Sequence, residues 1–215
     1  MLKSLIGSVA VALALSGCAA PKGNSLSVFP AYNAKQKHAT VRVEGMSEPV
    51  ERVKVYSFLD ADAPKEKPAD FENAYAEARL GYSLGGIDDA LVPLSVVAEY
   101  NGGNGVEDTV RLWALFAKSL WKGNFTLAKV YPVESSGHKG MQCGIFVSQD
   151  ITDRIGVSGL IEYNFKPRTV YGEAEIGIKL TDRLSAVGQV RAFVPTEKPD
   201  EKDIAPIVGV RYSFR

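Results

Sequence analysis

The segment 169-TVYGEAEIGIKL-180 alternates between two kinds of side chain along nearly its whole length. Its apolar residues fall on even positions and include Val170, Ala174, Ile176, Ile178 and Leu180. The odd positions carry Tyr171, Glu173, Glu175 and Lys179. Because successive side chains of a β strand point to opposite faces, this period of two predicts a strand with one apolar and one charged face.

The same alternation recurs in residues 155–165, 184–194 and 204–214. When the apolar residues alone assign the faces, the six charged residues of the four segments all fall on the opposite face: Glu162, Glu173, Glu175, Lys179, Arg191 and Arg211. Each segment has eleven or twelve residues. Ordinary strands have about five or six, and tilted membrane-spanning strands about 9 to 11. The length therefore favours strands that turn their apolar face to lipid and enclose their charges, whereas a soluble barrel would reverse the two faces.

Further alternating segments precede these four. Counted from the C-terminus, they give ten strands, at residues 50–59, 73–84, 90–100, 108–120, 123–133, 140–149, 155–165, 169–180, 184–194 and 204–214. Short turns such as 181–183 alternate with longer polar connections such as 195–203, as in outer-membrane barrels. We predict an all-β, antiparallel up-and-down transmembrane β-barrel of about ten strands, or twelve if segments near 26–32 and 41–43 also form strands.

The N-terminal segment MLKSLIGSVAVALALSGCAA combines a basic start, an apolar run and a small-residue box before Cys18. This order is typical of a bacterial lipoprotein signal peptide. We predict a signal peptide over residues 1–17, lipidation of Cys18, a periplasmic tether over 18–38 and a barrel over 39–215. The tether and the short turns then share the periplasmic side of the outer membrane. The predicted partners are outer-membrane lipid and the barrel-assembly and lipoprotein-sorting machinery.

Composition excludes several other functions. Lys+Arg and Asp+Glu both number 25, so the chain has no general attraction for nucleic acid. With only two histidines, His38 and His138, a histidine-based metal site is not expected. The segment Glu134-Ser135-Ser136-Gly137-His138 could supply a hydroxyl, a base and a carboxylate, but adjacency in sequence does not make a catalytic triad. We predict no enzymatic activity, no metal and no cofactor.

The charged faces supply the candidate pore-lining residues, which are Arg52, Lys54, Tyr56, Glu77, Arg79, Glu99, Arg111, Glu162, Glu173, Glu175, Arg191 and Arg211. Pairing Leu180 with Leu184 across a tight turn places Glu173 opposite Arg191, and Glu162 is the expected third member of that cluster. Ten strands enclose little more space than the eight that side chains can fill, so any pore is narrow. A plug of salt bridges and a constriction that selects solutes are equally compatible with this pattern.

Three stretches resemble the opening of the nucleoside-specific, channel-forming porins of the Tsx type: residues 55–64 (VYSFLDADAP), 75–84 (YAEARLGYSL) and 99–103 (EYNGG). The resemblance covers about residues 53–105. It implies a passive outer-membrane channel for nucleosides or similar small solutes, in a twelve-stranded barrel with aromatic and ionisable residues lining the pore. This chain is shorter and carries a lipid box.

The sequence thus predicts a lipidated outer-membrane barrel that acts as a narrow passive channel for small solutes, with nucleosides as candidates. Two alternatives stay open at this point. One is a non-conducting barrel with a structural or partner-binding role through its external loops. The other is a soluble periplasmic lipoprotein with a lipocalin-like barrel for an apolar ligand. Solute identity, conduction, oligomeric state and the role of Cys143 are left open by the sequence.

Overall fold

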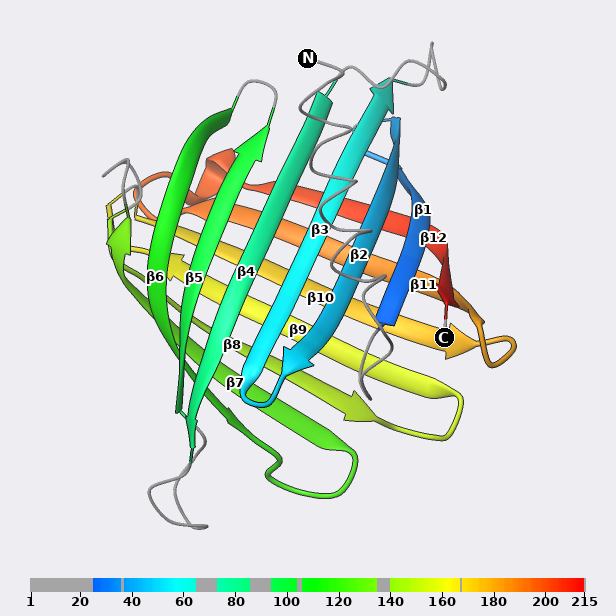
Figure 1. Cartoon of the computed structure of the whole chain (residues 1–215). Coiled ribbons are helices and arrows are strands. Elements are labelled where there is room, and N and C mark those ends of the chain that lie inside the picture. Colours follow the sequence, from blue (N-terminus) through cyan, green and yellow to red (C-terminus); the bar gives the residue numbers. More distant parts are fainter. Residues whose placement is uncertain are drawn as a thin grey trace.

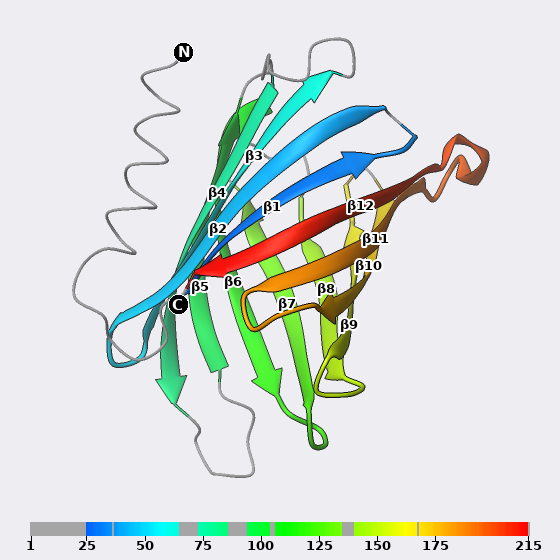
Figure 2. The same cartoon turned by 90° about the vertical axis from the view of Figure 1, so that its right-hand side faces the viewer.

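The computed structural model describes residues 25–35, 37–64, 73–85, 94–103, 106–134, 140–166 and 168–214. Twelve antiparallel strands form one closed barrel, in which each strand pairs with its neighbours in the chain and β1 pairs with β12 (Figures 1 and 2). The predicted all-β, up-and-down barrel is confirmed, with the larger of the two expected strand numbers. No helix in the described part of the chain is long and apolar enough to cross a membrane.

The strands are mostly as long as the sequence predicts. They are β1 (Ser25–Asn33), β2 (His38–Val50), β3 (Val53–Pro64), β4 (Asn73–Gly85), β5 (Leu94–Gly103), β6 (Val106–Lys118), β7 (Asn124–Glu134), β8 (Gln142–Asp150), β9 (Ile155–Asn164), β10 (Thr169–Lys179), β11 (Leu184–Pro195) and β12 (Asp203–Phe214). A single 3-10 turn, Pro199–Glu201, lies in the last loop. The predicted strand at residues 50–59 is misplaced, because β3 begins at Val53 and continues to Pro64. Residues 90–93 of the predicted strand 90–100 lie outside the described residues.

The predicted tether over residues 18–38 is also too long, because Ser25–Asn33 forms β1. In this strand the alternation is less clear, since Phe29 lies on the otherwise polar inner face and is buried there. Gly209 on the neighbouring strand β12 accommodates that ring, because a Cβ at Gly209 would lie 2.6 Å from the Phe29 side chain. The signal peptide and Cys18 lie outside the described residues.

The two ends of the barrel differ in their connections. The two-residue turn 51–52 and the turns 119–123, 151–154 and 180–183 lie at the end that also holds Ser25 and Phe214. The turn sequence Thr-Asp-Arg occurs twice, at residues 152–154 and 181–183. The threonine hydroxyls accept hydrogen bonds from the backbone N–H groups of Ile155 and Leu184, at the start of the next strand. These turns and the N-terminal end of β1 therefore share one end, as expected, although the opposite end also has short connections, from Asn33 to His38 and from Asn164 to Thr169. The expected turn near residues 85–89 lies almost entirely outside the described residues.

The outer surface of the barrel is apolar and its inside is charged. Ile176, Ile178, Val190 and Val208 are 42–59 % exposed. By contrast, Glu77, Glu99, Arg111 and Lys129 are buried. Aromatic pairs mark the outer rims, with Tyr163 packing edge-on against Phe165 at one end and Tyr212 against Phe214 at the other. A soluble lipocalin-like barrel requires the opposite arrangement, so the structure argues against that alternative.

Candidate functional site in the barrel interior

Polar side chains of all twelve strands contact side chains of other strands inside the barrel, and we call this set of residues the interior belt. One member from each strand, in chain order, is Ser27, Glu44, Tyr56, Arg79, Glu99, Arg111, Tyr131, Gln142, Asn164, Glu173, Gln189 and Arg211. Every one of these residues occupies an inward position because strand alternation and the antiparallel register keep one parity inside. Side-chain contacts of the belt thus reach all twelve strands of the described barrel.

Glu99 is the centre of the belt on one side of the barrel. It is 1 % exposed, and its two oxygens accept hydrogen bonds from Arg79 Nε at 2.9 Å, Asn101 Nδ2 at 2.9 Å and Arg111 Nη1 at 3.4 Å. Tyr131 donates a further bond at 3.4 Å. A carboxylate this deeply buried is stable as a charged group only when such donors surround it. Glu99 therefore joins strands β4 to β7.

The belt continues from Arg111 through amide side chains. Arg111 Nη1 donates to Gln142 Oε1 at 3.3 Å, Gln142 donates to Asn164, and Asn164 Nδ2 donates to Thr169 Oγ1 at 3.0 Å. This chain links β6, β8, β9 and β10. The strand β10 then carries the belt on to Glu173 and Glu175.

Across the barrel, Glu173 and Glu175 organise the second half. Arg191 Nε lies 3.2 Å from Glu173, and the Gln189 amide donates to Glu173 at 2.8 Å and to Glu175 at 3.4 Å. The predicted register of Glu173 opposite Arg191 is confirmed. The prediction that Glu162 is the third member of this cluster is wrong, because Glu162 forms an ion pair with Lys129 on β7.

Gly144 explains the Glu162–Lys129 pair. It lies on β8 between Lys129 on β7 and Glu162 on β9. A Cβ at Gly144 would lie 2.9 Å from Glu162 Cγ and 3.2 Å from Lys129 Cε. The absence of a side chain thus lets the two charged groups meet over the intervening strand.

Arg211 joins the two ends of the chain. Its guanidinium donates two hydrogen bonds to Glu175 on β10, at 2.7 and 3.0 Å, and its Nε lies 3.7 Å from Glu44 on β2. Glu44 in turn accepts from Ser27 on β1 at 2.8 Å and from Tyr56 on β3 at 3.4 Å. The Arg79 guanidinium lies 5.2 Å from the Tyr56 ring, which closes the belt.

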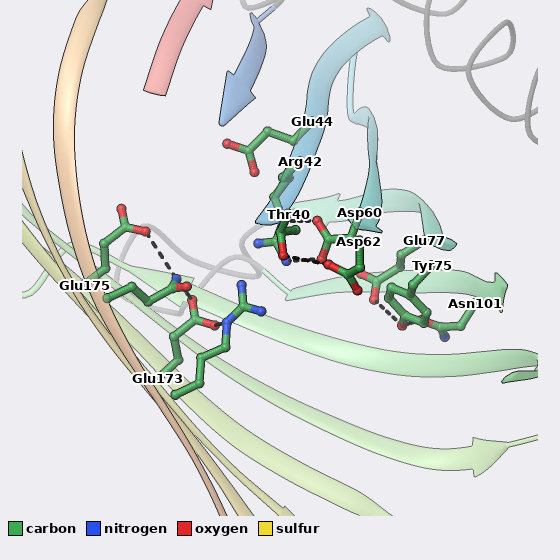
Figure 3. Close-up of polar contacts among 12 residues, drawn as sticks. Thr40, Arg42, Glu44, Asp60, Asp62, Tyr75, Glu77, Asn101, Glu173 and Glu175 are labelled. Atoms are coloured by element: carbon green, nitrogen blue, oxygen red, sulfur yellow. Dashed lines mark hydrogen bonds and ion pairs between the residues drawn. The ribbon is translucent and has the colours of Figure 1, made fainter. Parts of the chain in front are cut away.

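Figure 3 shows the inward side chains of β2 and β3 on one wall and Glu173 and Glu175 on another. Arg42 and Asp60 form a bidentate pair with two contacts of 2.7 Å, and Thr40 donates to Asp62 at 2.6 Å. Asp60 and Asp62 lie beyond the strand predicted at residues 50–59. They lie in β3 because the alternation with Leu59, Ala61 and Ala63 extends the strand.

The structure brings ten of the twelve candidate residues together in the interior: Tyr56, Glu77, Arg79, Glu99, Arg111, Glu162, Glu173, Glu175, Arg191 and Arg211. Lys54 lies on the same face but is exposed near the turn end. The placement of Arg52 is wrong, because it occupies the β2–β3 turn with a φ of 69° and its side chain contacts Glu51.

Sequence reasoning missed several interior residues, chiefly Arg42, Glu44, Asp60 and Gln142. Arg42 and Glu44 alternate with Val41 and Val43, a signal that was visible but short. Gln142 lies within the strand predicted at residues 140–149, but a single uncharged amide does not mark it as part of the charged interior. The Glu134–His138 segment lies almost wholly outside the described residues, and among those described no group of three metal-ligating side chains is found.

Replacing Arg211 with methionine is expected to lower the free energy of unfolding by about 2 kcal/mol, because Glu44 and Glu175 would keep their charges without their shared cation. The figure is at the low end for buried pairs, since all three side chains retain some exposure. Urea titration of barrels folded in lipid vesicles measures it. Arg211→Lys is the matched control. Its free energy of unfolding should lie between those of the wild type and the methionine variant, because lysine keeps the charge but loses the bidentate geometry. Equal stability of all three proteins would refute the role of Arg211.

Comparison with known proteins gives a fold and no family. No family model matches the chain, and no curated protein sequence matches it. Its structure is similar to a KdgM porin in complex with disordered oligogalacturonate, with a TM-score of 0.64, 11 % identity, and coverage of 89 % of this chain and 99 % of that one. It is also similar to a NanC porin, with a TM-score of 0.64, 8 % identity, and coverage of 87 % of this chain and 98 % of that one.

An enzyme shares the same architecture. The outer-membrane phospholipase A of Escherichia coli gives a TM-score of 0.64 at 12 % identity, with coverage of 96 % of this chain and 97 % of that one. At such identities the likeness establishes the barrel fold alone. These structures do not include a nucleoside channel, so that part of the sequence resemblance stays a prediction.

Proposed function

We propose that this chain is an outer-membrane β-barrel, anchored by a lipid at Cys18, which acts as a narrow passive channel for small polar solutes. The observation that carries the proposal is the inverted polarity of the barrel, with large apolar side chains exposed outside and charged pairs enclosed. A surface of this kind is stable in a bilayer, where apolar residues face hydrocarbon and charged residues avoid it. The porin folds among the similar structures support the same function.

The size of the barrel limits what can pass. Twelve strands enclose more space than eight, and eight leave an interior that side chains alone can fill. In this barrel the belt occupies part of that space, so the passage fits small solutes and not polymers or folded proteins. Nucleosides, sugars and amino acids are the classes to be compared.

The second candidate function is a non-conducting barrel with a structural or partner-binding role. The dense ion pairing of the belt favours it, because a fully paired belt could close the passage at rest. Enzymatic activity has no support from the described residues, although a phospholipase shares the fold. The two candidates differ in a single property, which is whether purified, folded protein conducts ions.

Planar-bilayer recording tests the proposal. Protein purified with its lipid anchor should produce discrete current steps, and vesicles containing it should swell in solutions of permeant sugars, amino acids or nucleosides. Correct folding is verified by heat-modifiable gel mobility. Folded protein that is silent in both assays would leave the non-conducting barrel. Incorporation of labelled palmitate, lost in Cys18→Ser, tests the anchor.

Arg191→Ala is expected to make the channel more selective for cations, which shifts its reversal potential in a salt gradient. Arg191 is the ionic partner of Glu173, and its removal leaves that carboxylate with the uncharged donors Gln189 and Tyr171. Recording in a salt gradient measures the cation-to-anion permeability ratio, which should rise by about twofold. An unchanged ratio in a conducting variant would show that this cluster does not line the passage.

A further inference from the structure

Charged side chains of the interior differ in exposure around the circumference of the barrel. On strands β5 to β8, Glu99, Lys129 and Arg111 have side chains that are 1–9 % exposed. Apolar packing explains why these charged side chains are so little exposed. Val97, Trp113 and Tyr131 form a buried cluster with Leu115, and the two aromatic rings lie 5.0 Å apart. We call strands β5 to β8 the closed sector.

Cations of the closed sector add to this packing. Lys129 Nζ lies 5.3 Å from the centre of the Tyr131 ring and 6.0 Å from that of Trp113. The Arg111 guanidinium lies 5.7 Å from the Tyr131 ring. Side chains held between rings and carboxylates in this way leave little volume for water or solute.

The other eight strands, β9 to β12 and β1 to β4, form the open sector. Most of their charged side chains at the level of the belt are 12–29 % exposed, and these are Arg42, Glu44, Asp60, Arg79, Glu162, Glu173, Glu175, Arg191 and Arg211. Glu77 is the exception, because Tyr75 and Arg79 cover it. Water therefore reaches the charges of this sector and not those of the closed sector.

The two sectors also differ in charge. Among the described inward side chains of the open sector, the carboxylates near the belt are those of Glu44, Asp60, Asp62, Glu77, Glu162, Glu173 and Glu175, and the guanidinium groups are those of Arg42, Arg79, Arg191 and Arg211. Asp203 lies at the far end of β12 and pairs with Lys35. At the level of the belt, the described side chains of the closed sector place the carboxylate of Glu99 against Arg111 and Lys129. Lys54 and Lys179 also face inward, but they are exposed at the turn end of the barrel. The excess negative charge thus lies on the accessible side.

A buried acceptor lies within the same sector. Gln189 is 4 % exposed and donates both to Glu173 and to Glu175, while its Oε1 has no hydrogen-bond partner in the described part of the chain. An orphaned acceptor between two carboxylates suits an N–H donor that carries positive charge.

We propose that solutes cross the barrel along an off-centre path beside the open sector, and that its excess of carboxylates selects small solutes bearing a cationic group. This inference rests on the proposed channel function and names the class of solute. In a narrow passage with low-dielectric walls, a net charge of one sign raises the local concentration of the opposite sign. The closed sector makes the passage narrower and places solutes against the carboxylates.

Selectivity measurements give the first test. In a potassium chloride gradient the wild-type channel should prefer the cation. Glu44→Gln and Glu173→Gln should each lower the cation-to-anion permeability ratio by about twofold. The matched control is Glu197→Gln, which changes an exposed loop residue paired with Arg168 and should leave the ratio unchanged. Vesicles should swell faster in a cationic amino acid such as arginine than in glutamate.

Thiol labelling gives a second test that needs no current. Thr40 on β2 and Thr109 on β6 both face inward, and Thr109 is buried in the closed sector. With Cys18 and Cys143 replaced by serine, Thr40→Cys in the folded barrel should react with a water-soluble cationic methanethiosulfonate, which forms a mixed disulfide and releases methanesulfinate. Thr109→Cys should react only after unfolding, and mass spectrometry reads the difference.

The outcomes separate the two proposals. If the folded protein gives no current, the proposed channel function is overturned. The labelling pattern then still decides whether the interior is open on one side. If the protein conducts but shows no cation preference, or if Glu44→Gln and Glu173→Gln leave its cation-to-anion permeability ratio unchanged, the proposed selectivity is overturned and the proposed channel function stands. Equal labelling of the two cysteine variants overturns the off-centre path.

Discussion

Glu99→Ala is expected to lower the free energy of unfolding by about 3–5 kcal/mol, because the substitution removes a buried carboxylate that Arg79 and Arg111 share. It also removes the acceptor for Asn101 and Tyr131. The loss arises mainly from charged groups that keep their desolvation cost when their partner is removed. Urea unfolding in lipid vesicles, followed by tryptophan fluorescence, measures it. Buried Trp113 packs against Tyr131, whose hydroxyl bonds to Glu99.

Two variants make this result specific. Glu99→Gln keeps the size and the acceptor oxygen but removes the charge, so its loss should be about half that of the alanine variant. Glu197→Ala removes an exposed loop carboxylate and should change stability by less than about 0.5 kcal/mol. If Glu99→Ala were no more destabilising than Glu197→Ala, Glu99 would not be the centre of the belt.

Ile176→Lys is expected to lower the free energy of unfolding from the membrane by about 2–4 kcal/mol, the cost of a lysine on the lipid face near the bilayer midplane. Ile176 lies in the middle of β10 and is 45 % exposed on the outer surface. On a soluble protein the same exposed position would tolerate lysine with a change of at most about 0.5 kcal/mol. The substitution therefore tests the membrane assignment directly.

The matched control is Ser158→Lys, which inserts the same charge on the inner face of β9. Ser158 pairs with Glu175 in the register, so an ammonium there gains a nearby carboxylate and avoids lipid. Its effect should be below about 1 kcal/mol. If Ile176→Lys were as mild as Ser158→Lys in vesicles, the apolar face would not contact hydrocarbon.

Part of the interior could be predicted from the chain alone. The register that pairs Glu173 with Arg191 follows from the tight turn at residues 180–183, because two strands joined by a short turn can pair in few ways. The inward placement of Glu99 and Arg111 follows in the same way from alternation. Arg52 was misplaced because alternation does not show where a strand begins, and the turn before Val53 takes up that residue.

The partners of most charges could not be predicted. Glu162 bonds with Lys129 two strands away, and only the missing side chain of Gly144 between them permits it. The seam between β1 and β12 brings Arg211 near Glu44, although the two residues lie at opposite ends of the chain. Such contacts depend on strand tilt and on the reach of long side chains across the lumen.

The sequence by itself determined that the chain forms long two-faced strands, and their length favoured enclosing the charged face, because period two and strand length are local properties of the chain. Only the tertiary structure decided which face is enclosed, how many strands close the ring, which charges pair across it and which side of the interior is filled. These depend on contacts between strands that are not neighbours in the chain, and those contacts form only when the barrel has closed.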